Sequence, residues 1–396
     1  MKTFRNIALL AVLGAAFLSS CRGRQRVEVP ETSGNAAYAQ YFDLLSEGEG
    51  WAIVSVSPYD GSTDTLRVAE PLQKIVCMST SHVGFLDAIG AADAVAAVSG
   101  LAFVSSPAMR ERIAEGRVAE AGYDAAPAYE TLVQLRPDVV LSYSLGGDTE
   151  MDGRLRALGL RVFTLYEHLE THPLARAEYV RLFGALTGRM AVADSLFPVV
   201  SSNYLSLAIP LSSELPEFED GLTKSDRASS ERPQNEDGGA VLDTASSNKP
   251  VFEDGPQKVL VNLPYAGVWY IPGAESYMAR LIRDAGGEVL GAEPGTSQSG
   301  MISLEKAYQY ACEADWWLNA GNVRSMEELI SESAVFTEFP VARPGRVYTN
   351  NRRQSPGGGN DFWESGAVRP DLILKDLRTI FAGGPEDSLY YYRAVR

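Results

Sequence analysis

Short apolar runs alternate with segments of helical periodicity from residue 74 onward. After the first run, Ser79 can cap a helix whose apolar positions recur at helical spacing as far as Gly90. The runs do not alternate strictly between apolar and polar residues, which is typical of parallel strands covered on both faces. The pattern therefore predicts an α/β lobe over residues 71–172. Its expected strands are residues 74–78, 95–98, 138–143 and 161–165, and its expected helices include residues 129–135 and 151–158.

The same alternation of apolar runs and helical segments resumes near residue 257. It predicts a second α/β lobe over residues 257–384, followed by a tail over 385–396. Between the lobes, apolar positions keep helical spacing from 173 to 209, which predicts one long interlobe helix with kinks at Gly188 and Pro198. The capping-box residues Ser325 and Glu328 open one helix of the second lobe. The expected strands are residues 258–263, 288–290, 315–319 and 346–348, and the expected helices include 275–285, 303–312 and 372–381.

The N-terminus reads as a targeting segment. Lys2 and Arg5 precede an apolar stretch over residues 7–18, which is short for a bilayer span and typical of a signal peptide over residues 1–20. The stretch ends Leu-Ser-Ser-Cys, which resembles the lipobox of bacterial lipoproteins and implies lipidation of Cys21. An ordinary secretory signal with an incidental cysteine is the alternative. We expect the protein to be lipid-anchored in the cell envelope, facing the periplasm or the outer side of the cytoplasmic membrane.

Two further segments fall outside the lobes. Residues 21–70 are expected to form a polar tether and then a hairpin, with strands at 41–44 and 51–56 around the turn 47–50. Residues 210–256 form an acidic low-complexity insertion, since residues 212–254 hold eleven acidic and four basic side chains.

Composition narrows the function classes. Of the 396 residues, 45% are hydrophobic and 22% charged, as in a soluble globular protein, and the formal net charge of −16 disfavours nucleic acid as a partner. Cys77 and Cys312 lie in apolar runs and are expected to be buried and unpaired. Trp316 and Trp317 are expected in the core.

Residues 346–366 concentrate polar and aromatic side chains between a strand and a helix. Arginines and asparagines donate hydrogen bonds, three glycines at 357–359 allow a tight turn, and Phe362 with Trp363 offers flat apolar area. A long loop of this composition is typical of a binding site, and a plain connection is the alternative.

Four stretches carry a resemblance to a known family. They are 75–90, 129–141 (Tyr-Glu-Thr-Leu-Val-Gln-Leu-Arg-Pro-Asp-Val-Val-Leu), 303–307 followed by 314–315, and 360–364 (Asn-Asp-Phe-Trp-Glu). These stretches resemble the class III periplasmic binding proteins of ABC importers, which serve ferric siderophores, haem and vitamin B12. The resemblance implies two α/β lobes with mainly parallel sheets joined by one rigid helix. It also implies a ligand between the lobes, a monomer and no enzymatic activity.

The resemblance assigns roles to individual residues. Glu130 and Glu305 match the glutamates that dock the two lobes onto a permease dimer, although a carboxylate in the first turn also stabilises the helix dipole. Loops after parallel strands are expected to line the ligand cleft. The candidates on the first lobe are Ser79, Thr80, Ser81, His82 and Tyr143, and those on the second are Tyr265, Trp269, Asn350, Asn351, Arg352, Arg353, Phe362 and Trp363.

The sequence leaves the ligand open among metal chelates. Arg352 and Arg353 suit an anionic ligand such as a ferric siderophore or the propionates of haem, and the aromatic pair suits a flat macrocycle. We therefore expect a ferric siderophore first and cobalamin second, with no resident cofactor. A bare metal ion held by His168 and His172 is one alternative, and contact of His82 with a metal is another. A lipoprotein enzyme is a third, although no nucleophile elbow, zinc motif or phosphate loop is present.

Overall fold

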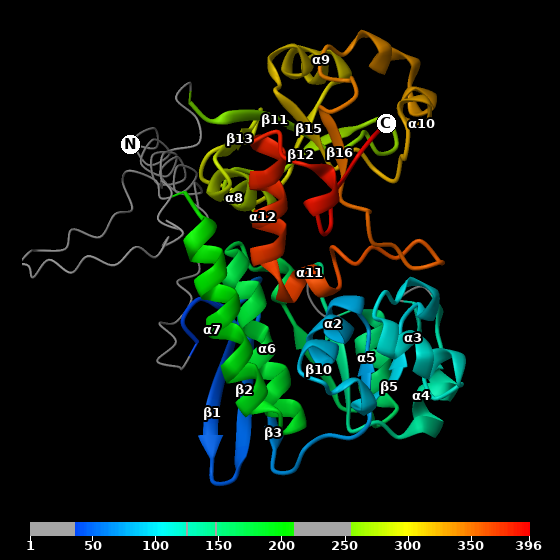
Figure 1. Ribbon diagram of the computed structural model, residues 1–396. Helices are drawn as coiled ribbons and strands as arrows, with labels where there is room; N and C mark the ends of the chain where they lie inside the picture. Colours follow the sequence, from blue (N-terminus) through cyan, green and yellow to red (C-terminus); the bar gives the residue numbers. More distant parts are fainter. Residues whose placement is uncertain (1–35, 124–125, 147–148, 210–254) are drawn as a thin grey trace, which may run out of the picture.

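The computed structural model describes residues 36–123, 126–146, 149–209 and 255–396. The predicted signal peptide, Cys21 and nearly all of the acidic insertion lie outside these residues. Within the described part of the chain, no helix is both long and apolar enough to cross a membrane. Two α/β lobes are stacked one above the other, the first below and the second above in Figure 1.

The first lobe is built on a parallel sheet with strand order β10-β9-β4-β5-β6. Ser79 caps α2 as predicted, because its side chain accepts a hydrogen bond from the Ser81 backbone N–H. The expected strands and helices of this lobe are confirmed to within a few residues. The strands are β4 (Ile75–Cys77), β5 (Val95–Val98), β6 (Ala119–Glu120), β9 (Val139–Tyr143) and β10 (Val162–Leu165), with the small pair β7 (Gly122–Tyr123) and β8 (Ala126–Pro127); the helices are α2 (Thr80–Ala88), α3 (Pro107–Ala114), α4 (Tyr129–Leu135) and α5 (Glu150–Ala157).

The second lobe repeats this plan with strand order β13-β11-β15-β16-β17, in which only β17 runs antiparallel to its neighbour among the described strands. Trp316 and Trp317 are buried in β15, as predicted. The expected tail is instead part of this lobe, because it supplies β17 and the buried Tyr391 and Tyr392. The strands are β11 (Gln257–Val261), β13 (Gly287–Val289), β15 (Trp316–Leu318), β16 (Val347–Thr349) and β17 (Arg393–Ala394), with the antiparallel pair β12 (Trp269–Ile271) and β14 (Gly300–Ile302); the helices are α8 (Tyr277–Asp284), α9 (Leu304–Glu313), α10 (Met326–Glu332), α11 (Ser365–Val368) and α12 (Pro370–Phe381).

The prediction of one continuous interlobe helix is wrong. The segment forms two helices, α6 (Pro173–Thr187) and α7 (Met190–Leu207), which pack side by side (Figure 1). Gly188 ends α6 in the left-handed conformation with φ 66°, whereas Pro198 lies within α7 without ending it. Helical spacing continues across the break, so periodicity alone does not reveal it.

Both helices connect the lobes. On α6, Leu174 lies in the core of the second lobe and Phe183 in the core of the first. The Tyr204 hydroxyl near the end of α7 donates a hydrogen bond to Asp284 of α8 at 2.5 Å. The two helices therefore connect the lobes by packing into both of their cores.

The predicted N-terminal hairpin is confirmed and extended. Strands β1 (Phe42–Glu47) and β2 (Gly50–Val56) pair as expected, and a strand missed from the sequence, β3 (Thr63–Val68), completes an antiparallel sheet. Phe42 packs against Tyr179 of α6, with ring centroids 4.5 Å apart. The sheet thus belongs to the first lobe and is not a separate hairpin.

Two buried carboxylates fix the chain just before this sheet. Glu178 of α6 accepts hydrogen bonds from the backbone N–H groups of residues 37, 38 and 39 at 2.7 to 2.9 Å. Glu170 accepts two more from residues 40 and 41. Five consecutive backbone donors thereby satisfy two carboxylates that are themselves buried, where an unpaired charge would be costly.

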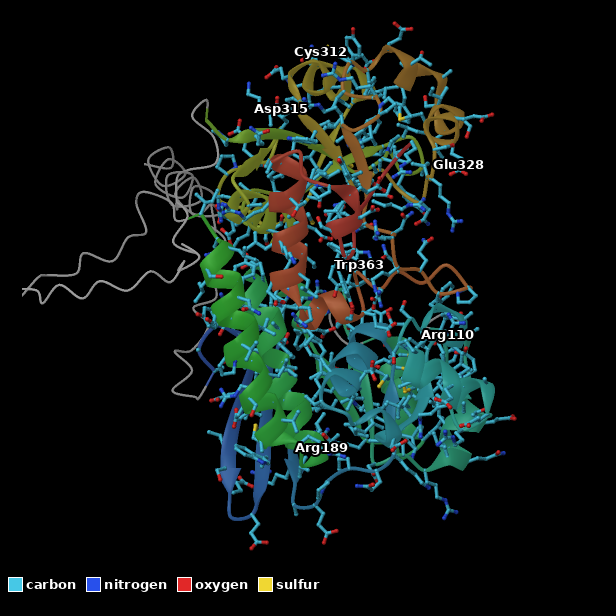
Figure 2. The ribbon with its side chains drawn as sticks, in the orientation of Figure 1. Arg110, Arg189, Cys312, Asp315, Glu328 and Trp363 are labelled. Carbon is cyan, nitrogen blue, oxygen red and sulfur yellow. The ribbon has the colours of Figure 1, made fainter. Side chains whose placement is uncertain are left out.

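The two cysteines differ. Cys77 is buried in β4, as predicted, whereas Cys312 is exposed on α9 and the prediction of burial is wrong there (Figure 2). Ala307 and Ala311 are the buried positions of α9, so the neighbouring Cys312 faces outward.

Candidate ligand-binding site

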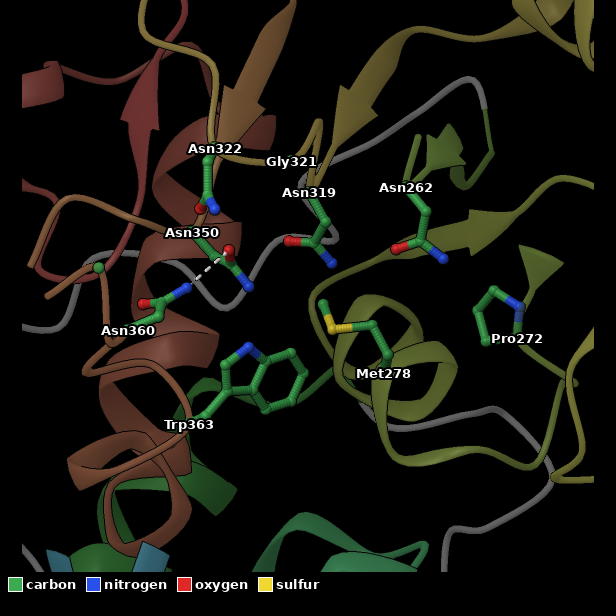
Figure 3. A pocket seen from close by; sticks show the side chains of 10 residues that line it. Asn262, Pro272, Met278, Asn319, Gly321, Asn322, Asn350, Asn360 and Trp363 are labelled. Atoms are coloured by element: carbon green, nitrogen blue, oxygen red, sulfur yellow. Dashed lines mark hydrogen bonds between the residues drawn. The ribbon is translucent and has the colours of Figure 1, made fainter. Parts of the chain in front are cut away.

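A cavity of about 560 Å³ lies at the carboxyl ends of the strands in the second lobe (Figure 3). Asn262 follows β11, Asn319 follows β15 and Asn350 follows β16. Because the three strands are parallel, these side chains emerge at one edge of the sheet, where such sheets bind ligands. The remaining lining residues are Pro272, Met278, Gly321, Asn322, Gly358, Asn360 and Trp363.

The lining is rich in carboxamides. Among the described lining residues none carries a charged side chain, while five asparagines supply both donors and acceptors. Asn360 donates to Asn350 Oδ1 at 3.1 Å, and the Tyr392 hydroxyl donates to Asn319 Oδ1 at 3.0 Å. The cavity therefore suits a ligand with neutral polar groups.

The backbone at two strand ends is in an unusual conformation. Asn262 and Asn319 both have positive φ, at 68° and 57°. Asparagine tolerates this left-handed region better than most residues, although it remains less favourable than the usual regions. Such outliers concentrate at binding sites, where the surrounding structure maintains them.

The predicted aromatic pair has divided roles. Trp363 is 46% exposed and lines the cavity, while its role in ligand binding stays a prediction. Phe362 is buried, with its ring edge-on to Trp363 at 4.7 Å and to Tyr391 and Tyr392 at about 6 Å, so it does not face a ligand. Phe362 instead packs in the core against the indole of Trp363.

The predicted arginine pair does not line the cavity. Arg353 Nε donates to Asp361 at 2.7 Å, and its guanidinium lies over the Tyr390 ring. Arg352 Nη1 donates to the Glu386 carbonyl oxygen. Both cations are therefore engaged within the second lobe, by Asp361 of the same loop and by Tyr390 and Glu386 near the end of the chain.

Asn351 also differs from the expectation. It is 2% exposed, and its Oδ1 accepts a hydrogen bond from the Thr349 hydroxyl at 2.7 Å. Only Asn350 of the predicted asparagine pair lines the cavity.

In the first lobe, only the first two of the four residues predicted at 79–82 are accessible. Ser79 and Thr80 are half-buried at the start of α2, whereas Ser81 and His82 are buried. Since His82 is fully buried, it cannot line a cleft, and the prediction that it does so is wrong.

Ser81 and His82 belong to an internal polar cluster around Glu167. The Ser81 hydroxyl donates to Glu167 Oε1 at 2.7 Å, and His82 Nε2 lies 3.5 Å from the same oxygen. Burial alone would raise the pKa of Glu167, but His82 and His168 outweigh burial and hold it well below its ordinary value. A charged carboxylate is therefore stabilised inside the first lobe.

The remaining predicted residues fall outside the cavity. Tyr143 is half-buried at the end of β9, and its ring is edge-on to His168 at 5.8 Å. Tyr265 is 77% exposed in the turn before β12. Trp269 is 1% exposed and donates from Nε1 to the Val261 carbonyl oxygen, so it is a core residue and the prediction that it binds ligand is wrong.

Six residues that line the cavity, four asparagines and two apolar residues, were missed from the sequence. A simple signal was available for two of them, because an asparagine directly follows the apolar run in 257–262 and in 315–319, as Asn350 follows β16. The missed lining residues are Asn262, Asn319, Asn322, Asn360, Met278 and Pro272.

The loop over residues 350–364, here called the interlobe loop, reaches from the second lobe to the first. The Ser355 hydroxyl donates to the Ala102 carbonyl oxygen at 2.7 Å. A Cβ on Gly357 or Gly359 would overlap the carbonyl oxygen of Ala102 or Phe103, so the glycine run permits this close backbone approach as well as a turn.

Glu364 makes further hydrogen bonds between the two lobes at the same junction. Its carboxylate accepts hydrogen bonds at 2.7 Å from the backbone N–H groups of Ser105 and Ser106, at the start of α3. Burial raises the pKa of Glu364 to about 8. The interlobe loop thus fixes the cavity-lining segment to the first lobe.

Glu130 and Glu305 are exposed in the first turns of α4 and α9, as predicted. The Ser303 side chain, by hydrogen bonding, lowers the pKa of Glu305. Docking of these carboxylates onto a permease stays a prediction.

No group of three or more metal-ligating side chains converges among the residues that the structure describes. His168 Nε2 lies 3.0 Å from the Ser144 carbonyl oxygen, and His172 Nδ1 accepts a hydrogen bond from the Leu174 backbone N–H. The two histidines therefore do not support a bare metal site.

Comparison with known proteins agrees with this architecture. No protein-family profile matches the chain. A periplasmic binding protein from Veillonella parvula superposes with a TM-score of 0.54 at 13% identity, covering 84% of this chain and 98% of that one. The chain has the class III periplasmic binding protein fold.

Two further solved structures share the fold. A periplasmic haem-binding protein from Pseudomonas aeruginosa gives a TM-score of 0.53 at 14% identity, over 82% of this chain and 98% of that one. A protein of an ABC-type Fe³⁺-hydroxamate transport system from Saccharomonospora viridis gives 0.50 at 15% identity, over 80% and 96%.

In sequence, the chain is similar to two uncharacterized lipoproteins of Methanocaldococcus jannaschii. One is 21% identical over 320 residues, or 78% of this chain, and the other 22% identical over 306 residues, or 73%. The chain matches 65% and 64% of the length of these relatives.

Proposed function

We propose that the protein is the substrate-binding lipoprotein of an ABC importer, which captures a metal chelate between its lobes and delivers it to a membrane permease dimer. The observation that carries this proposal is the amide-lined cavity at the carboxyl ends of the second lobe's strands. The fold supports it, since proteins of this fold include a haem binder and a member of an iron-hydroxamate transport system. The similarity to proteins named lipoproteins supports the envelope location and the lipid anchor at Cys21.

The chemistry of the cavity favours an uncharged chelate of the iron(III)-siderophore type, such as a ferric trihydroxamate. Arg352 and Arg353 were the reason to expect an anionic ligand, and neither lines the cavity. An anionic catecholate chelate or the propionates of haem would bring negative charge to a lining without a cation. A neutral chelate instead offers carbonyl and amide groups that asparagines can bind.

Cobalamin is the second candidate. The exposed indole of Trp363 offers a flat apolar face, and the surrounding carboxamides match the peripheral amides of a corrin ring. Both candidates offer neutral amide or carbonyl groups to a lining without charged side chains.

Fluorescence titration of the full chain in detergent tests this proposal. The probes are a ferric trihydroxamate, a ferric tricatecholate, haemin and cyanocobalamin. We expect quenching by a neutral chelate at micromolar concentration or below, because Trp363 lies in the cavity and a bound metal chelate quenches its emission.

Two variants assign the signal to the site. Trp363→Leu is expected to remove most of the quenching, while Trp51→Leu, in the N-terminal sheet, leaves it intact. Tighter binding of haemin or the catecholate than of either neutral chelate would contradict the proposed ligand class. Binding of none of the four would contradict the importer function.

A further inference from the structure

An apolar cavity of about 300 Å³ lies between the first lobe and the interlobe loop. Its walls in the first lobe are the short 3₁₀ helix η2 (Leu101–Phe103) and helix α3, and Pro356 and Gly357 of the interlobe loop form the facing wall. The volume is at the lower end of the range of small-molecule sites. The lining residues are Leu101, Ala102, Val104, Arg110, Ile113, Ala114, Pro356 and Gly357.

Apolar groups make up nearly all of this lining. Leu101 and Ile113 are half-buried and pack against the core of the first lobe, while Val104 is buried. Among the described lining residues none carries a carboxylate, and only Arg110 is charged. The lining therefore suits the apolar body of a small ligand and disfavours a ligand with many polar groups.

The guanidinium of Arg110 is exposed beside the interlobe loop (Figure 2). Arg112 on the same helix pairs with Asp93. Arg117, just beyond the helix, pairs with Glu115. Arg110 instead has no hydrogen bond or ion pair with any other described residue. An accessible cation of this kind can bind an anionic group at the cavity without first breaking another interaction.

The cavity lies at a contact between the two lobes. The Ala102 carbonyl oxygen accepts a hydrogen bond from the Ser355 hydroxyl at 2.7 Å, and a Cβ on Gly357 would overlap Ala102. Ala102 and Gly357 both line this cavity, and the next residue, Gly358, lines the amide-lined cavity. A ligand bound here therefore contacts both lobes at their junction.

We propose that this cavity binds a small monocarboxylate with an apolar body, such as an aryl or short alkyl acid. The apolar wall buries the body of the acid, and the Arg110 guanidinium pairs with its carboxylate. One free guanidinium matches one negative charge, so it neutralises a dianionic phosphate less well. The proposal is independent of the importer function, because the cavity shares no lining residue with the amide-lined cavity.

Calorimetric titration of the full chain in a nonionic detergent tests the proposal, with the detergent alone as the blank. The probes are 3-phenylpropionate, its neutral amide 3-phenylpropionamide, and acetate. We expect the aryl acid to bind about fivefold more tightly than its amide, because only the acid pairs with Arg110. Acetate should not bind, because it lacks the apolar body. No binding of the aryl acid, or binding of the amide or acetate as tight as that of the acid, would contradict the proposal.

The role of the charge is tested by removing it. Arg110→Gln is expected to weaken the binding of 3-phenylpropionate about fivefold and to leave the binding of the amide unchanged. Arg189→Gln is the matched control, because Arg189 is also exposed but lies just before α7, away from the cavity (Figure 2). The same affinity for the acid in Arg110→Gln as in the unmodified chain would overturn the proposal.

The role of the apolar wall is tested by filling the cavity. Ala114→Leu places a larger side chain in the lining and is expected to weaken the binding of both the acid and the amide about tenfold, without lowering the melting temperature. Ala108→Leu is the control, because Ala108 is an exposed alanine of the same helix that does not line the cavity. Unchanged affinity in Ala114→Leu would place the bound acid outside this cavity and refute the site.

Discussion

The strand ends of the two lobes differ although the lobes share one plan. In the first lobe, Ser81 and His82 follow β4 and are buried against Glu167. In the second lobe, Asn262, Asn319 and Asn350 follow their strands and line an open cavity. Polar residues that follow a parallel strand can thus be buried in an internal polar cluster or can line a cavity. Their position after the strand does not determine which of the two occurs.

The difference has an electrostatic component. The first lobe stabilises a buried charge with histidines, whereas the second presents neutral amides. We therefore expect substitutions in the first lobe's cluster to change stability and substitutions in the second lobe's cavity to change affinity.

The largest expected effect is on stability. Glu167→Ala removes the carboxylate that Ser81 and His82 face and leaves buried polar groups without a partner. We expect the free energy of unfolding to fall by about 3–5 kcal/mol. Urea denaturation measures this change, with Glu49→Ala in the exposed β1–β2 turn as the control. A stable variant with lost ligand binding would instead place the cluster in the binding site.

The junction between the lobes is expected to depend on pH through Glu364. Its pKa in the folded protein, about 8, lies above the ordinary value of 4.5. Glu364 therefore contributes its full share to the free energy of unfolding below about pH 4.5. This stabilisation is lost as the pH rises through 8, with a slope of at most about 1.4 kcal/mol per pH unit. Melting temperatures between pH 5 and 9 measure the loss.

Glu364→Gln should reduce this dependence, because a glutamine stays neutral and still accepts a hydrogen bond at the start of α3. Glu327→Gln, exposed on α10, is the matched control and should retain the pH dependence of the unmodified chain. If the melting temperature changed with pH in the same way in both variants, Glu364 would not be the cause of the pH dependence.

Neighbouring asparagines provide a smaller and sharper test of the cavity. Asn350→Ala removes a cavity-lining amide and is expected to weaken chelate binding about fivefold, or about 1 kcal/mol. Asn351→Ala removes a buried amide that accepts from Thr349 and should lower stability without changing affinity. Titration with the chelate and thermal unfolding of both variants measure the two effects. Weaker binding by Asn351→Ala together with unchanged binding by Asn350→Ala would contradict the position of the ligand in this cavity.

The smallest expected effect concerns the exposed carboxylates. Glu130→Ala combined with Glu305→Ala should reduce chelate uptake by cells severalfold and leave chelate affinity unchanged, because exposed carboxylates would orient the protein on the permease and contribute little affinity. Glu327→Ala, also in the first turn of a helix, is the control. Unchanged uptake in the double variant would exclude the docking role.

Much of the fold could be predicted from local patterns. The Ser79 and Ser325 caps, the alternation of strands and helices, and the burial of Trp317 all follow from the sequence. The break at Gly188 could not be predicted with certainty, because a single glycine within helical spacing is compatible with both a kink and a reversal.

Less of the site could be predicted. Asn350 and Trp363 line the cavity, whereas Arg352, Arg353 and His82, which were expected to line a ligand cleft, do not line it. The partners of Arg352 and His82, the Glu386 carbonyl oxygen and Glu167, lie far away along the chain, and no local pattern indicates them. Arg353 pairs with Asp361 eight residues further on in the same loop, and helical or strand periodicity does not reveal contacts within a loop.

The sequence by itself determined the order of strands and helices and the division into two lobes, because hydrophobic periodicity and capping act over a few residues. Only the tertiary structure decided which polar side chains face a ligand. Phe362 is buried because Tyr391 and Tyr392 arrive from the chain's end, and Arg352 does not line the cavity but donates a hydrogen bond to the Glu386 carbonyl oxygen. Such orientations depend on contacts that form only when distant segments pack, and local periodicity carries no record of them.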